Sequence, residues 1–245
     1  MLDICYNINM ENIMLKTLDK VLLSDNATQD FYQQYQNPEF KSWLVGILPE
    51  IEDAKQLEQD NPWHIYGCLD HILHSVESIN SQTKDLDDAT RRQLAYTMFL
   101  HDIGKPETHL RRYSKLYGRE IDSFFNHNKA SVKIADRVLG QFGFDADEQN
   151  KIKHLVHEHD IFMFITLDPD NNKHHKALSY PLIQELVDSY DNVGVGSGKE
   201  LLGQLIMVGR ADNLAQNPEM TQNSLKLLDK MNNMLTQDPN QTPVQ

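Results

Sequence analysis

The sequence predicts an all-α protein, and three observations lead to that prediction. Apolar residues recur along most of the chain at the 3.6-residue period of an α-helix. The short apolar–polar alternations that are typical of strands are scarce. The 245 residues are 40% hydrophobic and 24% charged, which is an ordinary globular composition without repeats or low-complexity tracts. We therefore expect helices packed around a core of useful size.

The charge balance argues against some classes of partner. The chain has 23 basic and 36 acidic residues, and its net charge of −13 opposes bulk binding to nucleic acid or to an anionic membrane. No apolar run approaches the roughly 18 residues that a membrane span needs. The N-terminus lacks the basic start and apolar stretch of a signal peptide. Two cysteines, Cys5 and Cys68, are too few for a disulfide framework. We expect a cytoplasmic protein.

The first quarter of the chain carries no recognised motif. Helical periodicity predicts helices near 10–23 and 28–35. We expect residues 1–60 to form a helical extension that covers the remaining domain or contributes to a homodimer interface.

The middle of the chain contains the best-marked helices, which are expected near 65–80, 89–103, 127–142 and 146–160. Gly104, followed by Lys105 and Pro106, is expected to end the second of these four. Asp145 and Glu148 resemble a capping box at the start of the last one.

The last third is expected to alternate helices with loops. Helices are predicted near 180–189, 198–214 and 221–236, whereas the polar stretches 163–179 and 191–198 are typical of loops. We assign residues 217–245 to a C-terminal helix and a disordered tail that begins at Asp238.

Two acidic residues continue the apolar faces of predicted helices. The spacing of Leu94 and Met98 continues into His101 and Asp102, and the apolar stripe of 198–214 continues into Asp212. An unpaired carboxylate on an apolar face costs several kcal/mol, so buried acids are normally paired or bind a metal ion.

Further histidines accompany these acids. His127 begins the apolar stripe of its helix, and His71 lies beside another stripe. His159 continues the stripe of 146–160, whereas His154 and His157 fall on other faces. One buried histidine is more often a hydrogen-bonded core residue, and one Asp at a helix end is often only a cap. Together, however, His and Asp are common ligands of Zn, Fe, Mn and Co, so the joint pattern predicts a metal site.

The order of these residues resembles the HD superfamily of metal-dependent phosphohydrolases. That family has a histidine on one helix, a His–Asp doublet ending the next and a distant Asp. These are matched by His71 in HIYGCLDHILHSV, His101-Asp102 in MFLHDIGKPE and Asp212 in GRADN. HDIGK is the specific element, because a bare His–Asp pair occurs by chance in many proteins. The resemblance covers residues 63–215 and implies an HD-domain helical bundle, which we assign to 61–216.

Many members add two histidines that allow a second metal ion. FFNHNKASVKIA and IKHLVHEHD resemble these segments and identify His127 and His159, the latter in agreement with the helix-face argument. HIYGCLDHIL is similar to the HD domain that accompanies bacterial tRNA nucleotidyltransferases. The residues before 63 lack a Gly-Ser turn followed by paired acids, so transferase activity is not expected.

The resemblance implies one or two divalent transition-metal ions per chain, among Fe, Mn, Co, Ni and Zn. The implied ligands form two sets that share Asp102: His71, His101 and Asp212 for one ion, and His127 and His159 for the other. A metal-bound hydroxide would then attack the phosphorus of a small phosphorylated substrate, which we expect to be a nucleotide.

Residues 105–119 are locally basic and follow the doublet directly. They contain one acidic residue, Glu107, and five basic residues: Lys105, Arg111, Arg112, Lys115 and Arg119. We predict that Asp102 and Lys105 act in catalysis and that Lys105, Arg111, Arg112 and Arg119 bind the substrate phosphate. A solvated basic loop is the alternative interpretation of this segment.

The leading hypothesis is a phosphomonoesterase or phosphodiesterase of the HD type. The alternative is a non-catalytic module that binds metal and regulates or senses a nucleotide. Retention of every ligand together with Lys105 favours the enzyme, because a sensor has no need of an open position for water. A third hypothesis, nucleic-acid processing, has the least support, because the chain is acidic.

Overall fold

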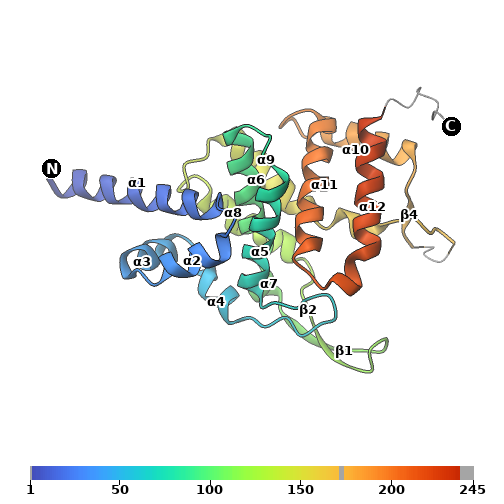
Figure 1. Cartoon of the computed structure of the whole chain (residues 1–245), viewed down its shortest axis with the longest axis horizontal. Coiled ribbons are helices and arrows are strands. Elements are labelled where there is room, and N and C mark those ends of the chain that lie inside the picture. Colours follow the sequence, from blue (N-terminus) through green and yellow to red (C-terminus); the bar gives the residue numbers. More distant parts are fainter. Residues whose placement is uncertain (1, 171–173, 238–245) are drawn as a thin grey trace.

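The computed structural model describes residues 2–170 and 174–237, and helices dominate them, which confirms the all-α prediction (Figure 1). The helices are α1 (Leu2–Leu22), α2 (Ala27–Tyr35), α3 (Pro38–Ile47), α4 (Glu50–Gln56), α5 (Cys68–Gln82), α6 (Asp88–Leu100), α7 (Lys105–Thr108), α8 (His127–Val138), α9 (Ala146–Glu158), α10 (Tyr180–Asp191), α11 (Gly198–Leu214) and α12 (Pro218–Thr236). The tail from residue 238, predicted to be disordered, lies outside the described residues.

The N-terminal extension is helical, as expected, and contains two helices that the periodicity did not predict. The side chain of Asn37 accepts hydrogen bonds from the backbone of Glu39 and Phe40, and Pro38 occupies the first turn, so α3 begins there. The short α4 follows after Pro49. In α4 seven residues make only about two turns, too few for a clear period.

The helix that carries the doublet ends earlier than predicted. The side chain of Asp87 accepts a hydrogen bond from Thr90 N and caps α6, which ends at Leu100 with His101 as its C-cap. Gly104 therefore does not end this helix; it lies in the turn between α6 and α7. The capping box of Asp145 and Glu148 is present at the start of α9.

Two short pairs of strands interrupt the helices. β1 (Leu110–Ser114) and β2 (Arg119–Ser123) form an antiparallel hairpin, in which Leu110 pairs with Ser123. Gly118 has φ +64° in its turn, a conformation that favours glycine. The predicted loop 163–179 contains β3 (Ile165–Thr166), which pairs in parallel with β4 (Lys176–Ala177). The hairpin projects from the helical body (Figure 1).

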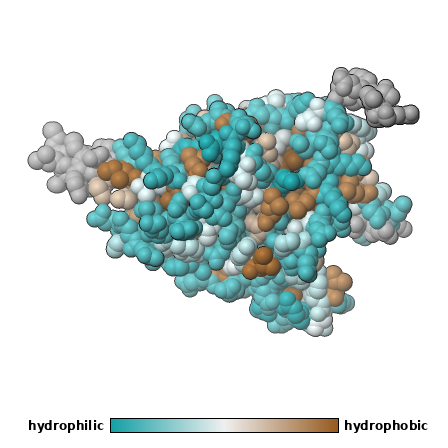
Figure 2. All heavy atoms as spheres, viewed as in Figure 1, coloured by the Kyte–Doolittle hydropathy of each residue, from teal (hydrophilic) through white to brown (hydrophobic). Residues whose placement is uncertain are grey.

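One continuous apolar core holds the chain together, from Met14 in α1 to Leu235 in α12. Helix α5 lies at its centre and packs against both α6 and α11 (Figure 1). Hydrophilic residues cover most of the face seen in Figure 2, where hydrophobic atoms form small separate patches. Among the described residues, no helix combines the length and the apolar run that crossing a membrane would require. The divisions at residues 60 and 216 stay predictions.

Candidate metal centre

Helix packing brings all of the predicted metal ligands together in two groups that share Asp102. His71 lies on α5, and His101 with Asp102 directly follows α6. His127 is the first residue of α8, after Asn126 in a left-handed turn with φ +63°. The remaining ligands are the C-cap of α9 and a residue near the end of α11, His159 and Asp212.

The first group is buried, and its most exposed side chain, that of Asp212, has 11% of its surface exposed. His71 Nε2 lies 3.0 Å from Asp102 Oδ2 and 3.0 Å from Asp212 Oδ1. His101 Nε2 lies 3.3 Å and 3.6 Å from the same two oxygens. The side chains of His71 and His101 are 0% exposed, so solvent does not separate these atoms.

The second group faces the other oxygen of Asp102. His127 Nε2 lies 3.1 Å from Asp102 Oδ1, and His159 Nε2 lies 3.7 Å from it. The two Nε2 atoms are 3.1 Å apart. Each oxygen of Asp102 therefore faces a different pair of histidines, so one carboxylate is shared by both groups.

Backbone carbonyls select the tautomer of all four histidines. Each Nδ1–H donates to a carbonyl oxygen at 2.7 to 3.2 Å, and the acceptors are Ala215 for His71, Met98 for His101, Phe124 for His127 and Val156 for His159. Every Nε2 of a neutral ring is then left with a lone pair that points into the centre. Bonds of this kind orient metal-binding histidines and raise their basicity.

This set of donor atoms fits a metal ion. Neutral Nε2 atoms and carboxylate oxygens are all acceptors, so contacts near 3 Å between them repel unless a proton or a metal cation lies between them. Within the described residues, His71 Nε2, His101 Nε2 and Asp102 Oδ1 are buried without a hydrogen-bond partner. Burial lowers the pKa of His101, but the carboxylates of Asp102 and Asp212 outweigh it and raise that pKa to about 10. The centre therefore attracts positive charge, and its His and Asp groups could bind a metal ion.

Lys105 lies at the edge of the first group. Its Nζ is 2.5 Å from Asp102 Oδ2, and it donates to Gln59 Oε1 at 2.8 Å and to His64 Nε2 at 3.0 Å. Burial acts to lower the pKa of Lys105, but Asp102 raises it, so the ammonium stays charged. Burial and the Lys105 charge lower the pKa of His64 to about 2, which keeps that ring neutral as an acceptor.

The predicted arginines are less free than the sequence suggested. Arg111 and Arg119 both pair with Asp60, at 3.0 Å and 2.6 Å, and Arg111 also pairs with Asp122. The guanidinium of Arg112 lies 4.8 Å from the centre of the Phe125 ring. The charge count of residues 105–119 did not include Asp60, an acid from outside the segment that the fold brings next to these arginines. A role of these arginines in substrate binding stays a prediction.

Two residues near the ligands were missed by the sequence reasoning. Gln59 reaches Lys105 from the N-terminal extension, and no local pattern marks it. Asp160 places its carboxylate oxygens 3.3 Å from His127 Nε2 and 3.6 Å from His159 Nε2. A signal for Asp160 was present, because it forms a second His–Asp doublet with His159.

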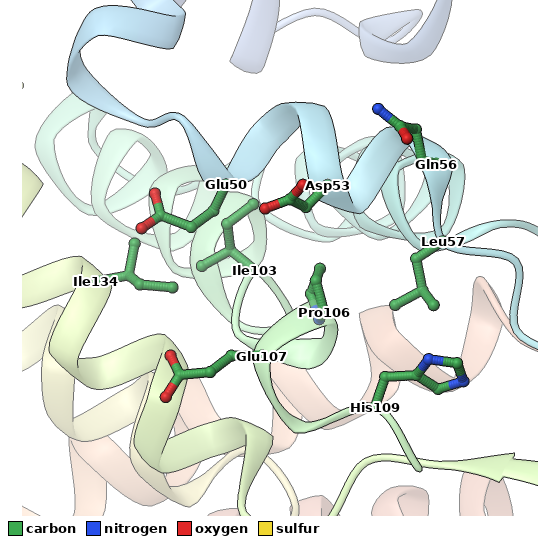
Figure 3. A pocket seen from close by; sticks show the side chains of 9 residues that line it. All are labelled: Glu50, Asp53, Gln56, Leu57, Ile103, Pro106, Glu107, His109 and Ile134. Carbon is green, nitrogen blue, oxygen red and sulfur yellow. The ribbon is translucent and has the colours of Figure 1, made fainter. Parts of the chain in front are cut away.

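A separate cavity of about 510 Å³ lies beside α7 (Figure 3). Only three of its lining residues belong to the basic segment: Pro106, Glu107 and His109. None of the candidate metal ligands lines it. The cavity is acidic through Glu50, Asp53 and Glu107, so it does not resemble a phosphate pocket.

Comparison with known proteins gives a distant similarity. No protein-family model matches the chain. A stretch of 129 residues is 26% identical to a bifunctional uridylyltransferase/uridylyl-removing enzyme of Cereibacter sphaeroides. The match covers 47% of this chain but 12% of that protein, so the chain corresponds to a small part of this relative. The order and geometry of the buried His/Asp cluster fit an HD-type site.

Proposed function

We propose that the chain is an HD-type, metal-dependent hydrolase of phosphoester bonds in a nucleotide or a related small phosphorylated substrate. The observation that carries the proposal is the position of Asp102. Its two oxygens face two histidine pairs whose Nε2 atoms are all oriented toward the centre. A shared carboxylate between two groups of ligands is typical of two-metal hydrolytic sites.

Divalent ions bound in such a site activate water and neutralise charge on phosphoryl oxygens. The protein holds the ligand atoms rigidly, because each imidazole is tied to a backbone carbonyl. Lys105 supplies a buried positive charge beside them. Its three N–H donors face Asp102, Gln59 and His64. If Asp102 Oδ2 were to bind a metal ion, Lys105 would lose this contact and could donate one N–H to a phosphoryl oxygen.

The similar protein supports the reaction class. Its name includes the removal of a uridylyl group. Such a removal breaks a phosphoester bond to a nucleotide, which is the chemistry proposed here. The short match supports the class of bond and does not identify the substrate.

Partial exposure of the centre favours the enzyme over the non-catalytic module. The His127 side chain is 13% exposed and the neighbouring Asp160 is 28% exposed, and in the first group Asp212 is 11% exposed. One side of the centre therefore reaches solvent, as substrate and water require. A purely structural metal site is normally closed by protein ligands.

The test begins with the metal content of protein purified without chelator, measured by plasma mass spectrometry. Protein loaded with Mn²⁺ or Fe²⁺ is then assayed against nucleoside monophosphates, nucleoside triphosphates and cyclic phosphodiesters. We expect metal-dependent phosphate or nucleotide release that a chelator abolishes. Metal binding without turnover of any phosphoester would favour the regulatory module, and absence of metal binding would refute the proposal.

A further inference from the structure

The two ligand groups of the centre differ in the number of carboxylates assigned to them. The first has two histidines and two aspartates, namely His71, His101, Asp102 and Asp212. The second has two histidines and only the shared Asp102. An ion in the second position would thus have fewer protein ligands and less negative charge around it.

Asp160 lies where a further ligand of the second group would lie. One of its oxygens is 3.3 Å from His127 Nε2, and the other is 3.6 Å from His159 Nε2. Both rings donate Nδ1–H to backbone carbonyls, so their Nε2 atoms are acceptors that face the carboxylate. Within the described residues, no Lys or Arg pairs with Asp160. A proton on one imidazole or a metal cation would resolve these contacts between acceptors, and two imidazole nitrogens with carboxylate oxygens form a donor set that suits a divalent metal ion.

The fold holds Asp160 in this position. It directly follows the C-cap of α9 and precedes the 3₁₀ turn η1 (Ile161–Phe164). Phe162 anchors that turn, because it is buried against α11 at Gly209, where a Cβ atom would lie 2.7 Å from its ring. The same helix carries Asp212, so one element supports both groups.

We propose that Asp160 is a ligand of a second divalent metal ion, together with Asp102, His127 and His159. This inference rests on the proposed metal-dependent function and adds one residue to its site. It gives each metal position two histidines and two carboxylates. This set suits a divalent ion such as Mn²⁺ or Fe²⁺. We therefore expect the second ion to be held as a regular part of the centre.

The test measures Mn²⁺ binding to the full chain by isothermal titration calorimetry, with Asp160→Asn as the variant. Mutation of a residue that only supports a metal ligand typically lowers metal affinity 10- to 100-fold. Loss of a ligand should therefore lower the affinity for the second ion at least about 100-fold. Binding of the first ion should stay unchanged. Electron paramagnetic resonance should show coupled Mn²⁺ pairs in the wild type and single ions in the variant.

Glu158→Gln is the matched control. It removes the same charge two residues earlier, where Glu158 contacts His157 and none of the ligands. It should bind two ions as the wild type does. Asp160→Ser is a second variant, and circular dichroism checks the folding of both. A folded Asp160 variant that keeps both ions at wild-type affinity would overturn the inference and leave the proposed function intact. Wild-type protein that binds only one ion would also overturn it, whereas wild-type protein that binds none would refute the proposed function itself.

Discussion

The backbone N–H of Gly104 donates to Ser131 Oγ at 2.9 Å, which joins the doublet turn directly to α8. A Cβ atom at Gly104 would lie 2.7 Å from Ala130 Cβ and 2.7 Å from the carbonyl oxygen of His127. The glycine of HDIGK is therefore needed for close approach of two backbones. This approach brings His127 to the other oxygen of Asp102.

Gly104→Ala should destabilise the protein by about 1–3 kcal/mol, because the added methyl group overpacks this contact. Urea unfolding followed by circular dichroism measures the effect. Gly46→Ala is the matched control, since Gly46 lies in α3 and nothing is within 4 Å of the position that an added methyl group would take. It should stabilise the protein by about 0.5–1 kcal/mol. Equal destabilisation by both would contradict the packing argument.

Asp102→Asn should remove both metal ions and lower phosphoester hydrolysis at least about 100-fold, because one carboxylate serves both groups. Helix content should remain close to that of the wild type, since asparagine keeps the shape of the side chain. Plasma mass spectrometry measures the metal content, an activity assay the rate of hydrolysis and circular dichroism the helix content. Normal turnover by this variant would exclude the proposed mechanism.

His159→Ala should lower the occupancy of one metal ion, whereas His154→Ala should leave both ions bound. Both histidines belong to the same segment, but His159 Nε2 faces Asp102 and His154 packs against the Tyr190 ring. Titration with Mn²⁺ distinguishes the two variants. Equal losses would show that the helix faces were assigned incorrectly.

Lys105→Met should retain both metal ions and lower kcat about 100-fold or more, as loss of one preorganised charged donor typically does. Lys115→Met is the control, because Lys115 is exposed in the hairpin turn. It should change kcat little. Steady-state kinetics with metal-loaded protein test this pair, and an unchanged kcat in Lys105→Met would remove Lys105 from catalysis.

The Cys68 thiol should resist modification in the folded protein. Cys68 is 0% exposed, and burial raises the pKa of its thiol to about 12. In a Cys5→Ser background, labelling by a disulfide reagent at pH 8 should proceed only as fast as the protein opens. Labelling within seconds in the absence of denaturant would contradict this burial.

Local sequence was enough to predict much of the fold and of the centre. Helical periodicity identified the faces of His101, Asp102, His159 and Asp212, because side-chain direction in a helix repeats every few residues. The same reasoning missed α3 and α4, which are short, and the hairpin 110–123, whose residues are mostly exposed and show little alternation.

Helical periodicity was sufficient for the fold class and for the inward-facing residues of the longer helices. The packing of helices places the two oxygens of Asp102 opposite two histidine pairs. It also brings Asp160 to 3.3 Å from His127 and Gln59 into contact with Lys105. Packing also pairs basic residues of 105–119 with acids from outside that segment, as Asp60 does with Arg111. Periodicity is a local property of the chain. Distances between side chains far apart in sequence depend on how α5, α6, α8, α9 and α11 pack around one core.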